Sequence, residues 1–200
     1  MISIMTGRGG VLVAASVALL AGAAAPAAQV KPLAARFSAT TVNMDPSGEP
    51  LKIDILRWSE RAERESLLAA FGQGDEPLLK ALQDAPTIGY IWTSGSLGYA
   101  LRFAHRIALP DGGERILLAT DRRLGAWDRR PWAAAGTAPP ADYAFTLIEL
   151  RLNRDGQGEG KMSLAARISA DEATKSLTLS DYEATPVLLS TVKREAGSTD

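Results

Sequence analysis

Residues 97–109 read LGYALRFAHRIAL and contain the clearest two-residue alternation in the chain. Larger, mostly apolar side chains occupy the odd positions from Leu97 to Leu109, and small or basic ones occupy the even positions. Successive side chains of a strand point to opposite faces, so this pattern predicts a β-strand with one buried face. The next four residues, PDGG, suit the positive φ values of a hairpin turn. Residues 115–121 are the expected return strand.

The same signals continue on both sides of this hairpin. Strands joined by tight turns pair antiparallel, because parallel pairing needs long crossovers. Between residues 59 and 84 the period becomes helical, which predicts two short amphipathic helices, the first capped by Ser59. The nine expected strands are residues 37–44, 51–58, 88–92, 97–109, 115–121, 143–152, 161–169, 176–182 and 187–193.

These elements predict a mainly β fold of the α+β class. We expect a single antiparallel β-barrel or β-sandwich of about eight or nine strands, with the helical pair inserted at about residues 59–84. The pattern leaves the choice between barrel and sandwich open. The globular domain is expected to span residues 36–195.

The N-terminus has the features of a secretory signal peptide at residues 1–28. It contains Arg8, an apolar run at residues 11–25 and small residues at Ala25 and Ala27 that suit a cleavage site. The run of about 15 residues is shorter than the roughly 20 that span a bilayer, which favours cleavage over a retained anchor. We therefore expect a periplasmic or secreted protein with no membrane span after cleavage, a leader at residues 29–35 and a disordered tail at residues 196–200.

Composition narrows the classes of partner and cofactor. The chain has 200 residues, of which 46% are hydrophobic and 22% charged, as in ordinary globular proteins. Removal of the signal leaves 21 basic and 23 acidic residues, without the basic surplus that a nucleic-acid partner requires. The absence of cysteine excludes disulfides and thiolate metal sites, and a single histidine argues against other transition-metal sites. We expect no metal and no cofactor.

The segment at residues 122–142 has no clean period and is predicted to be a long loop. It brings Trp127 and Trp132 close in sequence to Asp128, Arg129 and Arg130. Exposed indoles beside charged groups are typical of sugar- or anion-binding surfaces, and long loops on rigid sheets often carry binding sites. In the alternative interpretation, one or both tryptophans fold back to plug an open end of the sheet, and the arginines pair with acids.

Other chemistry-bearing features have structural explanations. His105, the only histidine, lies on the apolar face of its strand, where a buried structural imidazole is the simplest interpretation. The segment from Asn153 to Gly160 resembles a calcium loop, but its twelfth position is Leu164, where a bidentate glutamate is required. A glycine-rich turn is therefore predicted there. The chain has no nucleophile-elbow, paired-histidine zinc or dinucleotide-binding motif.

Several segments spread over nearly the whole mature chain resemble a group of exported hypothetical bacterial proteins. This resemblance implies export and a single domain, and it brings no activity, ligand or site residue with it. The segments are Arg36–Asn43, Ile53–Ser59, Ile88–Tyr90, Gly95–Tyr99, Leu118–Arg122 and the hairpin Tyr143–Ile168.

Three functions are compatible with these features. The first is a non-enzymatic periplasmic or secreted module that binds a small molecule or glycan at the barrel mouth or at the Trp127/Trp132 loop. The second is an envelope domain that binds another protein through the helical pair or a sheet edge. The third is a hydrolase whose carboxylates meet only in the folded chain. The lack of a recognisable catalytic set makes an enzyme the least favoured of the three.

Overall fold

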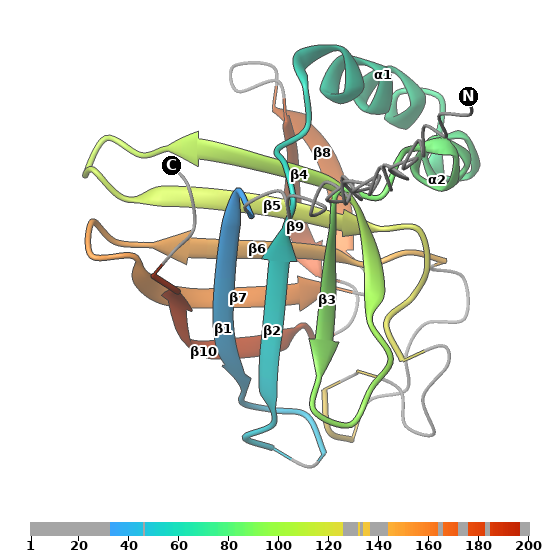
Figure 1. Ribbon diagram of the computed structural model, residues 1–200. Coiled ribbons are helices and arrows are strands. Elements are labelled where there is room, and N and C mark those ends of the chain that lie inside the picture. The colour runs from blue at the N-terminus through green and yellow to red at the C-terminus, as the bar shows by residue number, and fades with distance from the viewer. Residues whose placement is uncertain are drawn as a thin grey trace, which may run out of the picture. The chain divides into compact units, whose positions relative to one another are not determined.

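Eight strands close into an antiparallel barrel in the order β1-β10-β7-β6-β5-β4-β3-β2 (Figure 1). This confirms the predicted mainly β fold and decides between the two architectures that the sequence left open. The strands are β1 (Ala35–Thr41), β2 (Pro50–Ile55), β3 (Gly89–Thr93), β4 (Tyr99–Ala108), β5 (Glu114–Thr120), β6 (Leu147–Leu152), β7 (Gln157–Ser163) and β10 (Val187–Arg194).

The computed structural model describes residues 33–45, 47–125, 132, 134–136, 144–163, 166–171, 176–182 and 185–196. Side chains of residues 166–171 and 176–182 are not part of this description. All of these residues belong to the unit Lys31–Asp200. The predicted signal peptide lies outside the described residues, as does the tail beyond Ala196.

Closure of the barrel depends on β1, which pairs with β2 on one side and with β10 on the other. In β2, the alternation of Leu51, Ile53 and Ile55 with polar residues places the three apolar side chains inside, where they are fully buried. Because the first and last barrel strands pair with each other, none of the eight strands presents a free edge.

The interior of the barrel is filled by large apolar side chains rather than hollow. Every strand contributes, and the loop residue Trp132 joins the same cluster. An interior packed with side chains is typical of eight-stranded barrels. Members of the cluster include Phe37, Leu51, Ile53, Ile55, Ile91, Tyr99, Leu101, Ile116, Leu118, Ile148, Leu150, Met162, Val187, Leu189 and Val192.

Two β-bulges interrupt the alternation of the described barrel strands. In β4, Leu101 pairs with Thr120 and Phe103 pairs with Ala119, so Arg102 is one residue in excess of its partner strand. The prediction that the odd positions of residues 97–109 share one face is therefore wrong beyond Leu101: Phe103 faces outward and Ala104 faces the barrel interior. A bulge adds one residue to one strand only, and this exchanges the two faces of everything that follows.

The second bulge lies in β10, at Thr191. Leu189 pairs with Gly160 and Val192 pairs with Gly158, so β10 carries one extra residue there, and the same shift occurs against β1. Thr191 has a φ of +49°, the only positive φ of a non-glycine residue among the described residues. Its effect is that Val192 is buried in the barrel core, and Arg194 points to the same side of the strand.

The helical pair covers a second apolar cluster on the outside of the barrel. Helices α1 (Arg61–Phe71) and α2 (Asp75–Asp84) bury Leu67, Leu78 and Leu82 against the outer face of β4, β5 and β6. Both helices match the predicted insertion. The prediction that Ser59 caps the first helix is wrong. Glu60 is the N-cap of α1, and its backbone amide donates to the Glu63 carboxylate at 2.8 Å.

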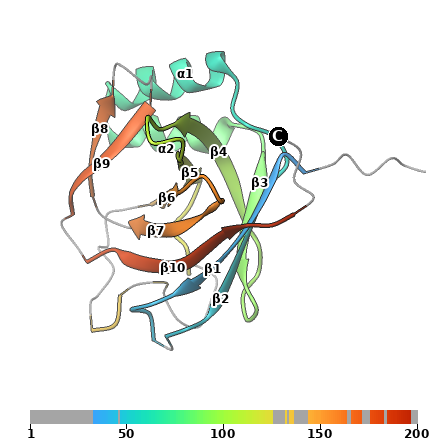
Figure 2. The same cartoon turned by 90° about the vertical axis from the view of Figure 1, so that its left-hand side faces the viewer.

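The predicted strand at residues 161–169 is in fact two strands. β7 begins earlier, at Gln157, and ends at Ser163, and β8 (Ala166–Asp171) pairs only with β9 (Ser176–Tyr182) in a separate two-stranded sheet. The described residues therefore form ten strands, where nine were expected of the sequence. Figure 2 shows the β8–β9 hairpin outside the ring of barrel strands, on the side where α1 lies.

Candidate functional site

A pocket of about 690 Å³ opens at the end of the barrel where the β4–β5 and β6–β7 hairpins turn and β10 ends. These turns lie together on the left-hand side of Figure 1. The lining comes from the adjoining ends of β4 and β5, the turn at residues 153–156 and residues 193–196. We call it the barrel-end pocket. Its volume is within the range of pockets that hold small organic molecules.

The floor of the pocket is an ionic triad. Arg106 Nε donates to Glu114 Oε2 at 2.5 Å, and the Arg194 guanidinium binds the other oxygen of the same carboxylate. Glu114 is only 7% exposed, and the Arg194 guanidinium carbon lies 5.1 Å from the centre of the Phe37 ring. Two guanidinium groups therefore share one buried carboxylate directly above the apolar core.

The bulges explain why both arginines lie on the interior-facing side of their strands at this end of the barrel, where Arg106 is exposed and Arg194 is largely buried. Arg106 pairs with the interior residue Ile116, and Arg194 pairs with the interior residue Phe37. Simple alternation places Arg106 on the face opposite Tyr99 and Leu101, so sequence reasoning missed this residue as a site candidate. No motif in the sequence marks the position of either bulge.

The turns around the pocket are braced by hydrogen bonds. Asn153 Oδ1 accepts from the backbone amides of Asp155 and Gln157, both at 3.0 Å. Arg154 Nε donates to the Asp111 carbonyl oxygen at 2.6 Å, which ties the β6–β7 turn to the β4–β5 turn. The predicted glycine-rich turn is thus confirmed for residues 153–156. These hydrogen bonds connect the two turns that border the pocket.

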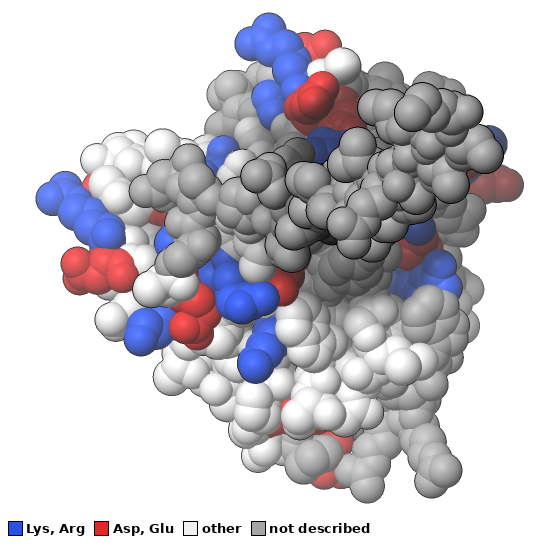
Figure 3. Space-filling view, in the orientation of Figure 1, with Lys and Arg blue, Asp and Glu red and all other residues white. Residues whose placement is uncertain are grey.

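Basic side chains outnumber acidic ones by four to three among the described residues that line the pocket. Of the acids, Glu114 is bound by two guanidiniums, and Glu195 accepts from Ser38 Oγ of β1 at 2.5 Å. Lys193 and Arg154 supply further positive charge to the lining. Figure 3 shows charged side chains gathered on the left-hand side of the molecule, where these turns lie.

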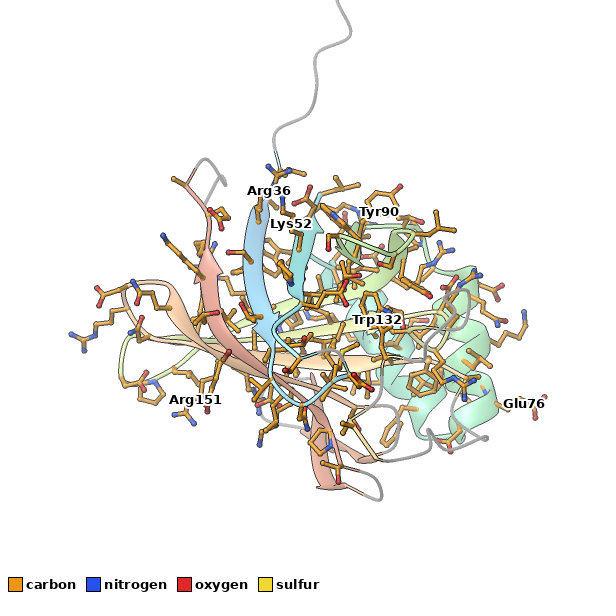
Figure 4. All side chains as sticks on the ribbon, turned by 90° about the horizontal axis from the view of Figure 1, so that it is seen from below. Arg36, Lys52, Glu76, Tyr90, Trp132 and Arg151 are labelled. Atoms are coloured by element: carbon orange, nitrogen blue, oxygen red, sulfur yellow. The ribbon has the colours of Figure 1, made fainter. Side chains whose placement is uncertain are left out.

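Of the residues predicted to form a contact surface, Trp127, Asp128, Arg129 and Arg130 lie outside the described residues. Trp132 is described and is only 4% exposed. Its ring meets Tyr99 edge to face, with centroids 5.4 Å apart, and it lies inside the ring of strands (Figure 4). The expectation of an exposed indole is wrong for Trp132, because burial in the barrel core removes more apolar surface from water. The alternative, a plug, holds for this residue.

A second charged cluster surrounds Asp121, which follows β5 and is 5% exposed. Arg102 donates to it through Nε and Nη2, and Arg122 donates through Nε at 3.0 Å. Burial acts to raise the pKa of Asp121, but the hydrogen bonds from Arg122 and Arg102 outweigh it, so the pKa is lowered. Arg102 also binds the Ala85 carbonyl, which makes the cluster a brace between the end of α2 and the barrel.

His105 lies on the outer face of β4, half-buried, with its ring near that of Phe103. Burial, together with the positive charges of Arg64 and Arg115, lowers its pKa to about 4. Its Nδ1 atom is buried without a hydrogen-bond partner. A neutral imidazole buried among cations fits the predicted structural role. It lies on the outer face of the barrel, whereas the pocket floor lies inside.

A groove of about 630 Å³ runs between α1 and α2, and we call it the helix groove. Leu67 and Phe103 are among its lining residues, and both belong to the apolar cluster beneath the helices. Charged side chains at its margin are paired, as in the ion pair of Lys80 with Asp84 at 2.8 Å.

Within the described part of the chain, no group of three or more His, Cys, Asp or Glu side chains is placed to hold a metal ion. Nor does that part contain a helix with the length and hydropathy needed to cross a membrane. Comparisons with protein-family models, with curated proteins and with solved structures find no match to this chain. The geometry of the fold is therefore the basis for a functional proposal.

Proposed function

We propose that this protein is a non-enzymatic binding module that holds a small molecule in the barrel-end pocket. The observation that carries the proposal is that two separate bulges, at Arg102 and Thr191, direct arginines onto one carboxylate at the pocket floor. Bulges at barrel rims commonly redirect a side chain toward a binding site.

The state of the carboxylates favours binding over catalysis. Both oxygens of Glu114 accept hydrogen bonds from guanidiniums, and Glu195 is bound by Ser38. A hydrolytic pair needs one carboxyl group to deliver a proton and another to activate water or attack. Glu114 and Glu195 are already committed to partners within the fold, so they support a binding site rather than a catalytic one.

The proposed location is the periplasm or the extracellular medium, after removal of residues 1–28. The basis is the tripartite pattern of this segment, with Arg8, the apolar run and the small residues before the cut.

A second candidate is an envelope domain that binds another protein through the helix groove. The apolar residues Leu67 and Phe103 in a groove with paired charges at its margin favour this alternative. It differs from the first in location, because the helix groove lies outside the barrel.

The test is native mass spectrometry of the protein isolated without denaturation from the envelope fraction of an exporting host. We expect a small molecule bound to the wild type. The variant Ala108→Trp, whose side chain fills the barrel-end pocket, is expected to lose this molecule. The control Ala69→Trp, at an exposed position of α1, is expected to retain it. A ligand retained by Ala108→Trp would contradict the proposal. A co-isolated polypeptide insensitive to Ala108→Trp, with no small molecule bound, would contradict it in favour of the second candidate.

A further inference from the structure

We infer that protonation of His105 releases the helical pair α1–α2 from the outer face of the barrel, so that the protein opens locally in mild acid. The inference concerns the outer face of β4 and is separate from the ligand proposed for the barrel-end pocket. Its basis is the position of this histidine beside Phe103, a member of the apolar cluster that the two helices cover.

The first turn of α1 is fastened to the barrel next to His105. The Ser59 amide donates to the carbonyl of Ala104, the residue before His105, at 2.8 Å, and the Ala104 amide donates to Ser59 Oγ at 3.0 Å. From α1, Arg64 Nη1 donates to the Ser59 carbonyl at 2.7 Å. These contacts hold the Arg64 guanidinium near the imidazole, where its positive charge acts on the ring.

The hydrogen bonding of the His105 ring suits its neutral form. The Nδ1 atom is buried without a hydrogen-bond partner. A neutral imidazole can carry its proton on the other nitrogen, but in the imidazolium form both nitrogens are N–H donors. Protonation in the closed protein therefore buries a charged group with a donor that meets no acceptor, which is more costly than an unfilled lone pair.

The charges that act on the ring have the same sign. Burial lowers the pKa of His105 to about 4, together with the positive charges of Arg64 on α1 and Arg115 on β5. In the same row of the sheet, β6 presents Glu149 two strands away, roughly 10 Å across the sheet. Release of α1 removes Arg64 and exposes the ring to water, so the opened form binds a proton more readily than the closed form.

The helical pair is attached to the barrel at both of its ends, which lets it swing out as a unit. Its start is held by the two bonds of Ser59, and its end by Arg102 Nη1, which donates to the carbonyl of the C-cap residue of α2 at 2.9 Å. Between these anchors the helices contact the barrel through the apolar cluster (Figure 2). The charges of α2 at the groove margin, Lys80 and Asp84, pair with each other and are largely exposed.

The experiment measures hydrogen exchange of the full chain by NMR at pH 7 and pH 5. Each rate is divided by that of an unstructured amide at the same pH to give an opening constant. Because His105 regains an ordinary pKa near 6.5 in the opened form, the opening constants of α1 and α2 are expected to rise roughly twentyfold between the two pH values. Amides of β5 and β6 are expected to stay far more protected than those of the helices at pH 5.

Variants then assign the effect to the imidazole. His105→Leu removes the titrating group, so its helices are expected to have equal opening constants at pH 7 and pH 5. The control Leu67→Ala removes a buried side chain of α1 and is expected to raise opening at both pH values while keeping the roughly twentyfold ratio. Arg64→Gln raises the pKa of closed-state His105 and is expected to reduce the ratio, whereas loss of its bond to Ser59 alone would raise opening equally at both pH values.

A second readout is the NMR titration of the imidazole itself, whose signals are unambiguous because the chain has one histidine. A ring pKa near 6.5 in the folded wild type would overturn the inference. So would equal opening of the helices at pH 7 and pH 5, or a rise that persists in His105→Leu. Loss of protection in β5 and β6 to the level of the helices would show that acid unfolds the whole molecule instead. None of these results bears on binding at the barrel-end pocket, so the two proposals can fail separately.

Discussion

At the scale of single residues, His105 is held half-buried on the outer face of β4, close to the cations Arg64 and Arg115. Burial and these two charges disfavour the imidazolium form, so the pKa is lowered to about 4. Its buried Nδ1 atom has no hydrogen-bond partner. Protonation of His105 in the folded state is therefore unfavourable, which fits a structural role.

This predicts a pH dependence of stability. In the unfolded chain the pKa of His105 returns to near 6.5, so unfolding takes up a proton between that pH and about 4. The contribution of neutral His105 to the stability of the fold is fully present above pH 6.5 and is lost as the pH falls toward 4. The free energy of unfolding, measured with urea across this pH range, is expected to fall more steeply with decreasing pH for the wild type than for His105→Leu. The two slopes are expected to differ by at most about 1.4 kcal/mol per pH unit. Parallel curves for the two proteins would contradict the account.

Asp121 adds a second sensitivity at lower pH. Its lowered pKa reflects the hydrogen bonds from Arg122 and Arg102, which prevail over burial. A carboxyl group with a lowered pKa stabilises the fold above its unfolded value of about 3.8 and loses that contribution as the pH falls further. The pH range over which His105 affects stability therefore lies above the range over which Asp121 does.

At the scale of elements, the bulges of β4 and β10 decide which side chains reach the barrel end. Each adds one residue to one strand, and each is followed by an arginine on the interior face. The glycines of β7 are explained by the close approach of β6. Gly158 lies so close to the Arg151 carbonyl of β6 that a side chain there would collide with the backbone. These glycines serve strand packing, whereas the turn proper is residues 153–156.

The bulge of β10 yields a stability prediction. Left-handed conformations cost most residues roughly 1–2 kcal/mol, but asparagine adopts them more readily than β-branched residues. Thr191→Asn is therefore expected to raise the free energy of unfolding by about 1 kcal/mol. The control Thr191→Val keeps the strain and removes the hydroxyl that contacts Thr40, so no gain is expected from it. Equal values for the two variants in chemical denaturation would show that strain is not the cause.

At the scale of the whole molecule, closure of the barrel joins its first strand in the sequence to its last. β1 and β10 pair with each other, and the pairing brings Phe37 opposite Arg194. Closure thus completes both the core and the pocket floor, since Arg194 reaches Glu114 only when the last strand docks on the first. Removal of free edges also protects the sheet from pairing with other chains.

Closure predicts uniform protection from hydrogen exchange. Ladder amides of β1 and β10 are expected to exchange as slowly as those of β5 and β6, because all four strands are bonded on both sides. Amides of α1 and α2, which lie outside the barrel, are expected to exchange faster through local opening. Exchange in β1 and β10 that is orders of magnitude faster than in β5, measured by NMR on the full chain, would show an opened barrel.

Much of the architecture follows from local sequence alone. Alternation in residues 51–55 and 97–101, the turn residues of PDGG and the helical period at residues 59–84 led to the correct strands, hairpins and helical insertion. These signals are local because side-chain period and turn conformation depend on neighbouring residues. These local signals suffice to predict a mainly antiparallel β fold.

The tertiary structure decided the closure of the barrel, the position of Trp132 and the identity of the pocket. Whether a sheet closes depends on pairing between strands about 150 residues apart, which no local period encodes. A bulge exchanges the faces of a strand without leaving a pattern, so Arg106 and Arg194 became site residues only through pairing with partner strands. The sequence by itself determined the elements, and long-range pairing determined which side chains meet.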